Sequence, residues 1–129
     1  MDNIANMLNT LKNGNIANKD VVFLPYSKLK FAIADCLEKA GYVGSISKKI
    51  KKGISVIEVS LKYNTVGQPR ISGVSRVSKP SRRLYASNKE LKPFMQGFGN
   101  TIVSTPKGIL TEKEAKKEMV GGELLFNIW

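Results

Sequence analysis

The sequence contains no histidine and only one cysteine, Cys36. Without an imidazole the chain can build neither a Ser-His-Asp nor a Cys-His nucleophile, and it has no histidine to ligate a metal. A single cysteine also excludes an internal disulfide and a cysteine-rich zinc site. We therefore expect no metal site, and we expect Cys36 to be a buried thiol in a reducing compartment.

Acidic residues and long apolar runs are scarce as well. Ten Asp and Glu stand against 21 Lys and Arg in 129 residues, so the net charge is +11 and the pI is near 9.9. Such an excess predicts an anionic partner, which can be nucleic acid, an anionic membrane surface or an acidic protein. No apolar run is long enough to span a bilayer, and the N-terminus lacks a signal-peptide pattern. We expect a soluble, cytoplasmic protein.

Nucleotide-binding glycine patterns are also missing. Gly97-Phe98-Gly99 begins like a dinucleotide fingerprint, but Ile102 stands where the third glycine belongs. Carboxylates cluster only at Glu112, Glu114 and Glu118, where the intervening lysines predict a solvent-exposed helix face. The sequence thus indicates no cofactor, no catalytic residue and no enzyme activity.

Periodicity predicts the order α-β-α-β-β over residues 1–64. We expect Asp2 to cap the first helix and Asn13-Gly14 to stop it, while Ser27 caps a second helix that ends at Gly41. The expected elements are a helix up to residue 12, a strand over 21–24, a helix over 28–40, and a hairpin of strands over 42–50 and 54–63.

Residues 65–129 are predicted to form a second subdomain, mostly β with short helices. The boundary is set by a segment with Gly67, Pro69 and little apolar content. The expected elements are strands over 70–77, 83–86, 101–104 and 123–129, with capped short helices after Ser87 and Thr111. The fold class is therefore α/β of the α+β type, in two small subdomains.

Basic residues gather in two places. Between Arg70 and Lys107 there are eight Lys and Arg but one acid, Glu90, and hydroxyl side chains are mixed among them. We interpret this segment as a nucleic-acid-binding face, since cations neutralise phosphates and hydroxyls reach 2′-OH groups. Tyr85 in this segment either stacks on a base or belongs to the core. The lysines of residues 48–52 are either a solvated turn or a second face.

The loop Ser104-Thr105-Pro106-Lys107-Gly108 is the sharpest local feature. It offers two adjacent hydroxyls and one cation, and Gly108 lets the chain turn without a Cβ. We expect this loop to lie between a strand and a capped helix. It either reads a nucleic-acid backbone or is a plain strand-to-helix connection.

Five motifs in this order resemble the bacterial small-subunit ribosomal protein eight family along essentially the whole chain. They are Asp2–Leu8 with Lys12-Asn13-Gly14, Ser27–Lys30, Arg76–Pro80 with Arg83 and Tyr85, Ser104–Gly108, and Thr111 with Ala115 and Gly121-Gly122-Glu123. The resemblance implies a two-part α/β protein that binds the central domain of small-subunit ribosomal RNA early in assembly. It also implies contacts with neighbouring ribosomal proteins and, in many bacteria, repression of the protein's own messenger RNA.

The resemblance also assigns residues. The main RNA-reading loop corresponds to Ser104, Thr105, Lys107 and Gly108, supported by Glu123, and additional contacts correspond to Lys79, Arg83, Tyr85, Lys28 and Lys30. We expect Glu123 to accept hydrogen bonds that hold Ser104 and Thr105 in place. The chain departs from the family where Pro106 replaces a common serine, which removes a hydroxyl and a backbone donor but stiffens the loop.

Two other functions fit the sequence less well. A basic peripheral protein of anionic membranes needs an amphipathic helix with a basic polar face, whereas the helix over 28–40 carries Asp35 and Glu38 among its lysines. An RNA-modifying enzyme with Lys107 as base has no partner acid or cofactor loop. Binding to ribosomal RNA, with no membrane partner, is the prediction that the sequence favours.

Overall fold

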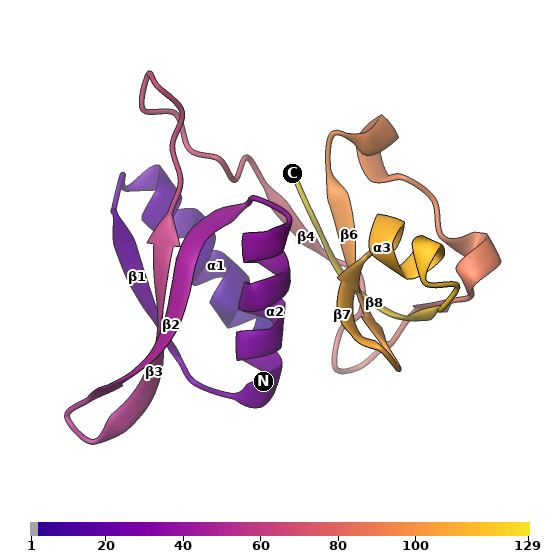
Figure 1. The fold of residues 1–129 in the computed structure, drawn as a ribbon, viewed down its shortest axis with the longest axis horizontal. Coiled ribbons are helices and arrows are strands. Elements are labelled where there is room, and N and C mark those ends of the chain that lie inside the picture. Colours follow the sequence, from indigo (N-terminus) through magenta and orange to yellow (C-terminus); the bar gives the residue numbers. More distant parts are fainter. Residues whose placement is uncertain (1–2) are drawn as a thin grey trace. The chain divides into compact units, whose positions relative to one another are not determined.

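The computed structural model describes residues 3–129, which form two compact units, residues 3–72 and residues 73–129 (Figure 1). Both combine helices with antiparallel strands, so the predicted α+β class is confirmed. Residues 65–72, which the sequence-based division assigns to the second subdomain, group with the first unit. Asp2, the expected cap of the first helix, lies outside the described residues.

The first unit follows the expected α-β-α-β-β order. Its elements are α1 (Asn3–Ile16), β1 (Val21–Pro25), α2 (Lys28–Lys39), β2 (Val43–Lys51) and β3 (Ile54–Leu61). The strands form an antiparallel sheet in the order β1-β3-β2. Ser27 caps α2 as predicted, because its Oγ accepts a hydrogen bond of 3.1 Å from the Lys30 N–H. Lys52 and Gly53, both with positive φ, make the tight turn between β2 and β3.

The first helix continues past its expected stop at Asn13-Gly14 and ends at Ile16. Gly14 is buried, and a Cβ placed on it would lie 2.6 Å from Cγ1 of Val22 in β1. Close packing of α1 on the sheet therefore keeps this glycine helical, although glycine costs about 1 kcal/mol relative to alanine inside a helix. The sequence signal for a helix end was overridden by a tertiary contact.

The core of the first unit lies between its helices and its sheet. Ile57 and Val59 of β3 are fully buried, and Leu61 nearly so, so alternate residues of this strand face the core. Leu11 of α1 and Leu37 of α2 are also buried, and α1 packs against β1 and β3 while α2 packs against β2. Burying each such side chain stabilises the fold by about 1.5–3 kcal/mol.

The second unit is built around its last strand. Its elements are β4 (Val74–Arg76), β5 (Tyr85–Ala86), two 3₁₀ helices η1 (Asn88–Glu90) and η2 (Phe94–Gly97), β6 (Asn100–Thr105), β7 (Gly108–Thr111), α3 (Glu112–Lys117) and β8 (Gly122–Ile128). Strand β8 pairs antiparallel with β4, β5 and β6, and β7 pairs with the other edge of β6. The strand expected over 70–77 is shorter than predicted, and β7 was not predicted at all.

Two layers of apolar residues stabilise the second unit. Ile102, Phe126 and Ile128 are fully buried in the sheet. Leu91, Val103 and Ala115 form a buried cluster that includes the inner side of α3. The capping box predicted at Thr111 is confirmed, since the Thr111 hydroxyl accepts from the Glu114 N–H and the Glu114 carboxylate accepts from the Thr111 N–H, both at 3.2 Å.

The expectation of a solvent-exposed carboxylate face on α3 is wrong for Glu112. This side chain is only 4% exposed. Its carboxylate accepts a hydrogen bond of 3.0 Å from the Asn100 side-chain amide and another from the Thr101 N–H. A buried carboxylate is tolerated when it accepts such bonds, so Glu112 ties the start of α3 to the start of β6.

Within residues 3–129, no helix is long and apolar enough to cross a membrane.

Candidate nucleic-acid interface

The expected reading loop is the tight turn of the β6–β7 hairpin, between two strands rather than between a strand and a helix. Thr105 pairs with Gly108, which leaves Pro106 and Lys107 at the tip. The Thr105 hydroxyl donates to the Gly108 carbonyl at 2.8 Å and accepts from the Lys107 N–H at 3.1 Å. Gly108 has a φ of +116°, a conformation that other residues rarely adopt. The Thr105 hydroxyl is therefore occupied inside the turn, where it positions Lys107.

Ser104 lies one residue before the turn, in a row of paired residues that crosses the sheet. It pairs with Glu123 of β8, and Glu123 pairs with Tyr85 of β5. Directly paired residues in antiparallel strands project from the same face of a sheet. The Ser104 hydroxyl has no hydrogen-bond partner among residues 3–129, and Tyr85 is 67% exposed. Of the two alternatives for Tyr85, the structure therefore has the exposed side chain and not the core residue.

Glu123 is held by Arg83. The guanidinium Nη1 lies 3.4 Å from each carboxylate oxygen, and the Glu123 side chain is 16% exposed against 58% for Arg83. No hydrogen bond joins the Glu123 side chain to Ser104 or Thr105 in the described part of the chain. Glu123 therefore does not orient those hydroxyls as expected. Its carboxylate orients the guanidinium of Arg83 instead. Partly exposed ion pairs contribute at most about 1 kcal/mol, so this contact matters more for position than for stability.

Two glycines allow β8 to enter between its neighbours. A Cβ on Gly122 would collide with the Ser104 carbonyl, and a Cβ on Gly121 would collide with the Ala86 carbonyl. Only glycine fits at both points, so the Gly-Gly-Glu motif brings Glu123 between β6 and β5. The row of Ser104, Glu123 and Tyr85 depends on this close approach.

Lys79 lies in a second turn, on the chain segment before β5. The N–H of Lys79 donates to the Arg82 carbonyl at 2.8 Å, and the N–H of Arg82 returns the bond at 3.0 Å. The Ser78 hydroxyl, 1% exposed, accepts from the Leu84 N–H at 2.9 Å and fixes the base of this turn. Lys79 and Arg82 are thus exposed together. Sequence reasoning did not select Arg82, although the Pro80-Ser81 pair between two basic residues is a turn signal.

The other two expected residues belong to the first unit. Lys28 and Lys30 lie in the first turn of α2, after the Ser27 cap. The N-terminus of a helix carries a partial positive charge, which together with two lysines favours an anion there. Eight of the ten expected residues therefore lie in the second unit, and seven of them gather at the β6–β7 turn and the adjoining face of the sheet.

The only acid of the basic segment 70–107 is engaged locally. Glu90 accepts a hydrogen bond of 2.8 Å from the Ser87 N–H in the capping box of η1. This backbone bond, followed by one with the Ser87 hydroxyl, holds the pKa of Glu90 below its ordinary value. Its charge stabilises the cap.

Comparisons with known proteins identify the family of this chain. The family model described as ribosomal protein S8 matches residues 2–129. The chain is 42% identical over 128 residues to the small ribosomal subunit protein uS8 of Rhizorhabdus wittichii, covering 99% of this chain and 97% of that one. It is 45% identical over 133 residues to the protein of the same name from Persephonella marina, covering 99% and 98%. The chain therefore belongs to the ribosomal protein S8 family.

Proposed function

We propose that this chain is a structural constituent of the small ribosomal subunit that binds the central domain of the ribosomal RNA directly and helps to nucleate its assembly. It would act in the cytoplasm, on the ribosome. Family membership supports the ribosomal role. The observation that carries direct RNA binding is the single sheet face on which the Ser104 hydroxyl, the Tyr85 ring and the Arg83 guanidinium gather beside the Lys107 turn.

Each group on this face suits a different part of RNA. The unpartnered Ser104 hydroxyl can donate to and accept from a 2′-OH or a base edge, and the exposed Tyr85 ring can stack on an unpaired base. Arg83, Lys107 and Lys79 would neutralise phosphates. Glu123 would then be a positioning residue that holds the guanidinium of Arg83.

Lys28 and Lys30 would add phosphate contacts from the first unit. Neighbouring ribosomal proteins are expected partners of the assembled chain. We also infer repression of the protein's own messenger RNA, because a messenger segment shaped like the ribosomal site would fill the same face. Ribosomal RNA and messenger would then compete for one site.

The test uses Ser104→Ala in the full chain with a central-domain RNA fragment, and Ser45→Ala, an exposed serine of the first unit, as the matched control. Loss of one hydrogen bond of about 1 kcal/mol predicts roughly fivefold weaker binding for Ser104→Ala and unchanged binding for the control. Isothermal titration calorimetry measures both affinities. Equal affinities of the two variants, with both folded, would refute the assignment of this face.

A further inference from the structure

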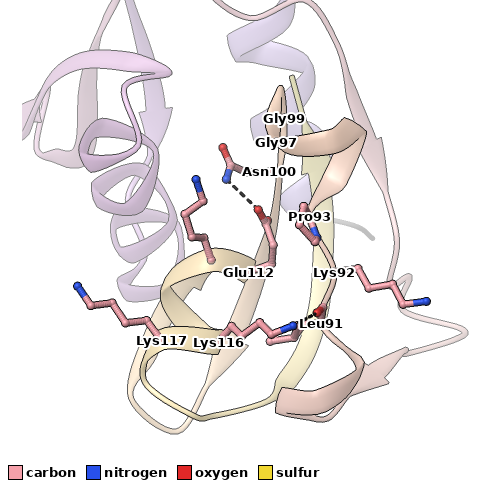
Figure 2. A pocket seen from close by; sticks show the side chains of 10 residues that line it. Leu91, Lys92, Pro93, Gly97, Gly99, Asn100, Glu112, Lys116 and Lys117 are labelled. Carbon is pink, nitrogen blue, oxygen red and sulfur yellow. Dashed lines mark hydrogen bonds between the residues drawn. The ribbon is translucent and has the colours of Figure 1, made fainter.

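A lysine-ringed pocket lies in the second unit, at the opposite end of the β6–β7 hairpin from the turn. Its cavity of about 250 Å³ is bounded by Leu91, Pro93, Gly97 and Gly99 (Figure 2). Asn100 in its wall is five residues from Thr105 along β6, which is about 16 Å of extended strand. The pocket is therefore separate from the face proposed to bind RNA.

The floor of the pocket is apolar, and hydrogen bonds hold its sides in place. Leu91 is 3% exposed and belongs to the buried cluster with Val103 and Ala115. The Lys116 ammonium donates to the Leu91 carbonyl at 3.2 Å, and Glu112 binds Asn100 across the wall. These bonds join α3 to the segment before β6, so the cavity has fixed sides and an apolar floor.

The rim of the pocket is strongly basic. Lys92, Lys113, Lys116 and Lys117 line it, against one carboxylate, Glu112, whose oxygens both accept hydrogen bonds. Figure 2 shows Lys92 and Lys117 extending outward on opposite sides of the pocket in this view. Four cations around an apolar hollow are complementary to an apolar group flanked by negative charges.

The loop beside the pocket also exposes apolar surface. Met95 and Gln96 both have positive φ, near +52° and +55°, and Gly97 follows at +93°. Such conformations are strained for residues with a Cβ and persist where the surrounding structure imposes them. Phe98, between two pocket-lining glycines, is 81% exposed, and Met95 is 49% exposed. This segment therefore carries exposed apolar side chains close in sequence to two glycines that line the cavity.

The lining favours an apolar side chain over a nucleobase. A base needs hydrogen-bond partners around its edge and, in RNA recognition, a ring on which to stack. The Asn100 amide and the Glu112 carboxylate are bonded to each other, and the lining residues, all within the described part of the chain, include no aromatic ring. A volume of 250 Å³ is also below that of sites for drug-sized ligands and suits one large side chain.

We propose that this pocket is a docking site for an acidic segment of another protein, which inserts one aromatic or leucine side chain against Leu91 and places its carboxylates on the lysine rim. A buried apolar anchor inside a ring of charged contacts is the usual organisation of a compact protein interface. The chain then uses one basic surface for RNA and a second, with an apolar centre, for a protein partner.

The test uses the full chain and three synthetic peptides in NMR titrations that follow the amide signals of Leu91, Gly97, Gly99 and Asn100. The first peptide has a central phenylalanine between three glutamates on either side. The second replaces the phenylalanine by alanine, and the third replaces the glutamates by glutamines. Saturable shifts at the pocket are expected with the first peptide, at least tenfold weaker binding with the second, and weaker binding also with the third.

Charge-reversal variants supply the matched control. The pocket variant changes Lys92, Lys113 and Lys117 to Glu, and the control changes three exposed lysines of the first unit to Glu, so both alter the net charge equally. Lys19, Lys52 and Lys62 are the control positions. The first peptide should bind the pocket variant at least tenfold more weakly than the control.

Three results would overturn the proposal. They are no saturable shift with the first peptide, equal binding of the phenylalanine and alanine peptides, and equal losses in the two charge variants. A uridine oligonucleotide that shifts the same four amides more strongly than the peptide would assign the pocket to RNA instead. Circular dichroism confirms that each variant is folded before titration.

Discussion

Replacing Thr105 with valine tests whether the turn of the β6–β7 hairpin is organised by one hydroxyl. Valine keeps the shape of threonine but removes the bond to the Gly108 carbonyl and the bond from the Lys107 N–H. A typical hydrogen bond contributes about 0.5–1.5 kcal/mol net. Because the turn is exposed, water replaces part of both bonds, and we expect a total loss of about 1–2 kcal/mol.

The loss should stay local, since the buried residues of β6, Ile102 and Val103, are not hydrogen-bond partners of this hydroxyl. The amide of Lys107 should exchange faster with solvent, while the amides of Ile102 and Val103 keep their protection. RNA affinity should fall about five- to tenfold, because binding must now order the turn. Hydrogen exchange followed by NMR measures the first effect, and calorimetry with a central-domain RNA fragment measures the second.

Thr105→Ser is the matched control, because it restores the hydroxyl without the methyl group. It should recover most of the Lys107 protection and most of the affinity. If Thr105→Val weakens RNA binding while Lys107 exchange is unchanged, the hydroxyl contacts RNA directly and the positioning argument is wrong. If neither quantity changes, the turn does not depend on this side chain.

Three further predictions follow from the second unit. Arg83→Ala should reduce the slope of log affinity against log salt concentration by about 1 and should weaken the binding of cognate and non-cognate RNA alike, as measured by titrations at several salt concentrations. An unchanged slope would show that Arg83 contacts no phosphate. Gly122→Ala should lower the melting temperature more than Gly53→Ala, because the first variant adds a clash with the backbone and the second adds only a backbone strain of about 1 kcal/mol. Equal decreases in melting temperature would contradict the packing argument. Ser87→Ala should raise the pKa of Glu90 part of the way toward its ordinary value, since the backbone bond remains, and a carboxyl NMR titration measures this change. Because the pKa of Glu90 is lowered in the folded state, its stabilisation of the cap is complete above the ordinary pKa and is lost as the pH falls through the lowered pKa.

Local patterns predicted the first unit well. The alternation of Ile57, Val59 and Leu61 shows which face of β3 is buried, and Ser27 marks the start of α2, because both signals depend only on neighbouring residues. The end of α1 could not be read in this way, since the contact of Gly14 with Val22 is made across the fold. A stop signal is reliable only where no such packing competes with it.

The second unit was harder to predict because its contacts are less local. Strand β7 is short and begins at Gly108, so its first residue looked like part of a loop. The lysines that follow Glu112 indicated solvent, while its hydrogen-bond partners lie about a dozen residues earlier at Asn100 and Thr101. The pairing of Glu123 with Arg83 also depends on strand register, which the sequence does not display.

Strand β8 has a consequence for how the protein is made. The three strands β4, β5 and β6 find their common partner only in residues 122–128, the last strand along the chain. During synthesis, domains generally fold in order from the N-terminus, and residues 3–72 can close their own sheet early. Strands β4 and β5, and the edge of β6 that does not pair with β7, must wait unpaired until β8 has left the translating ribosome. A nascent or truncated chain without β8 therefore lacks the sheet face described above, so only molecules whose synthesis has passed this strand would present the face proposed to bind RNA.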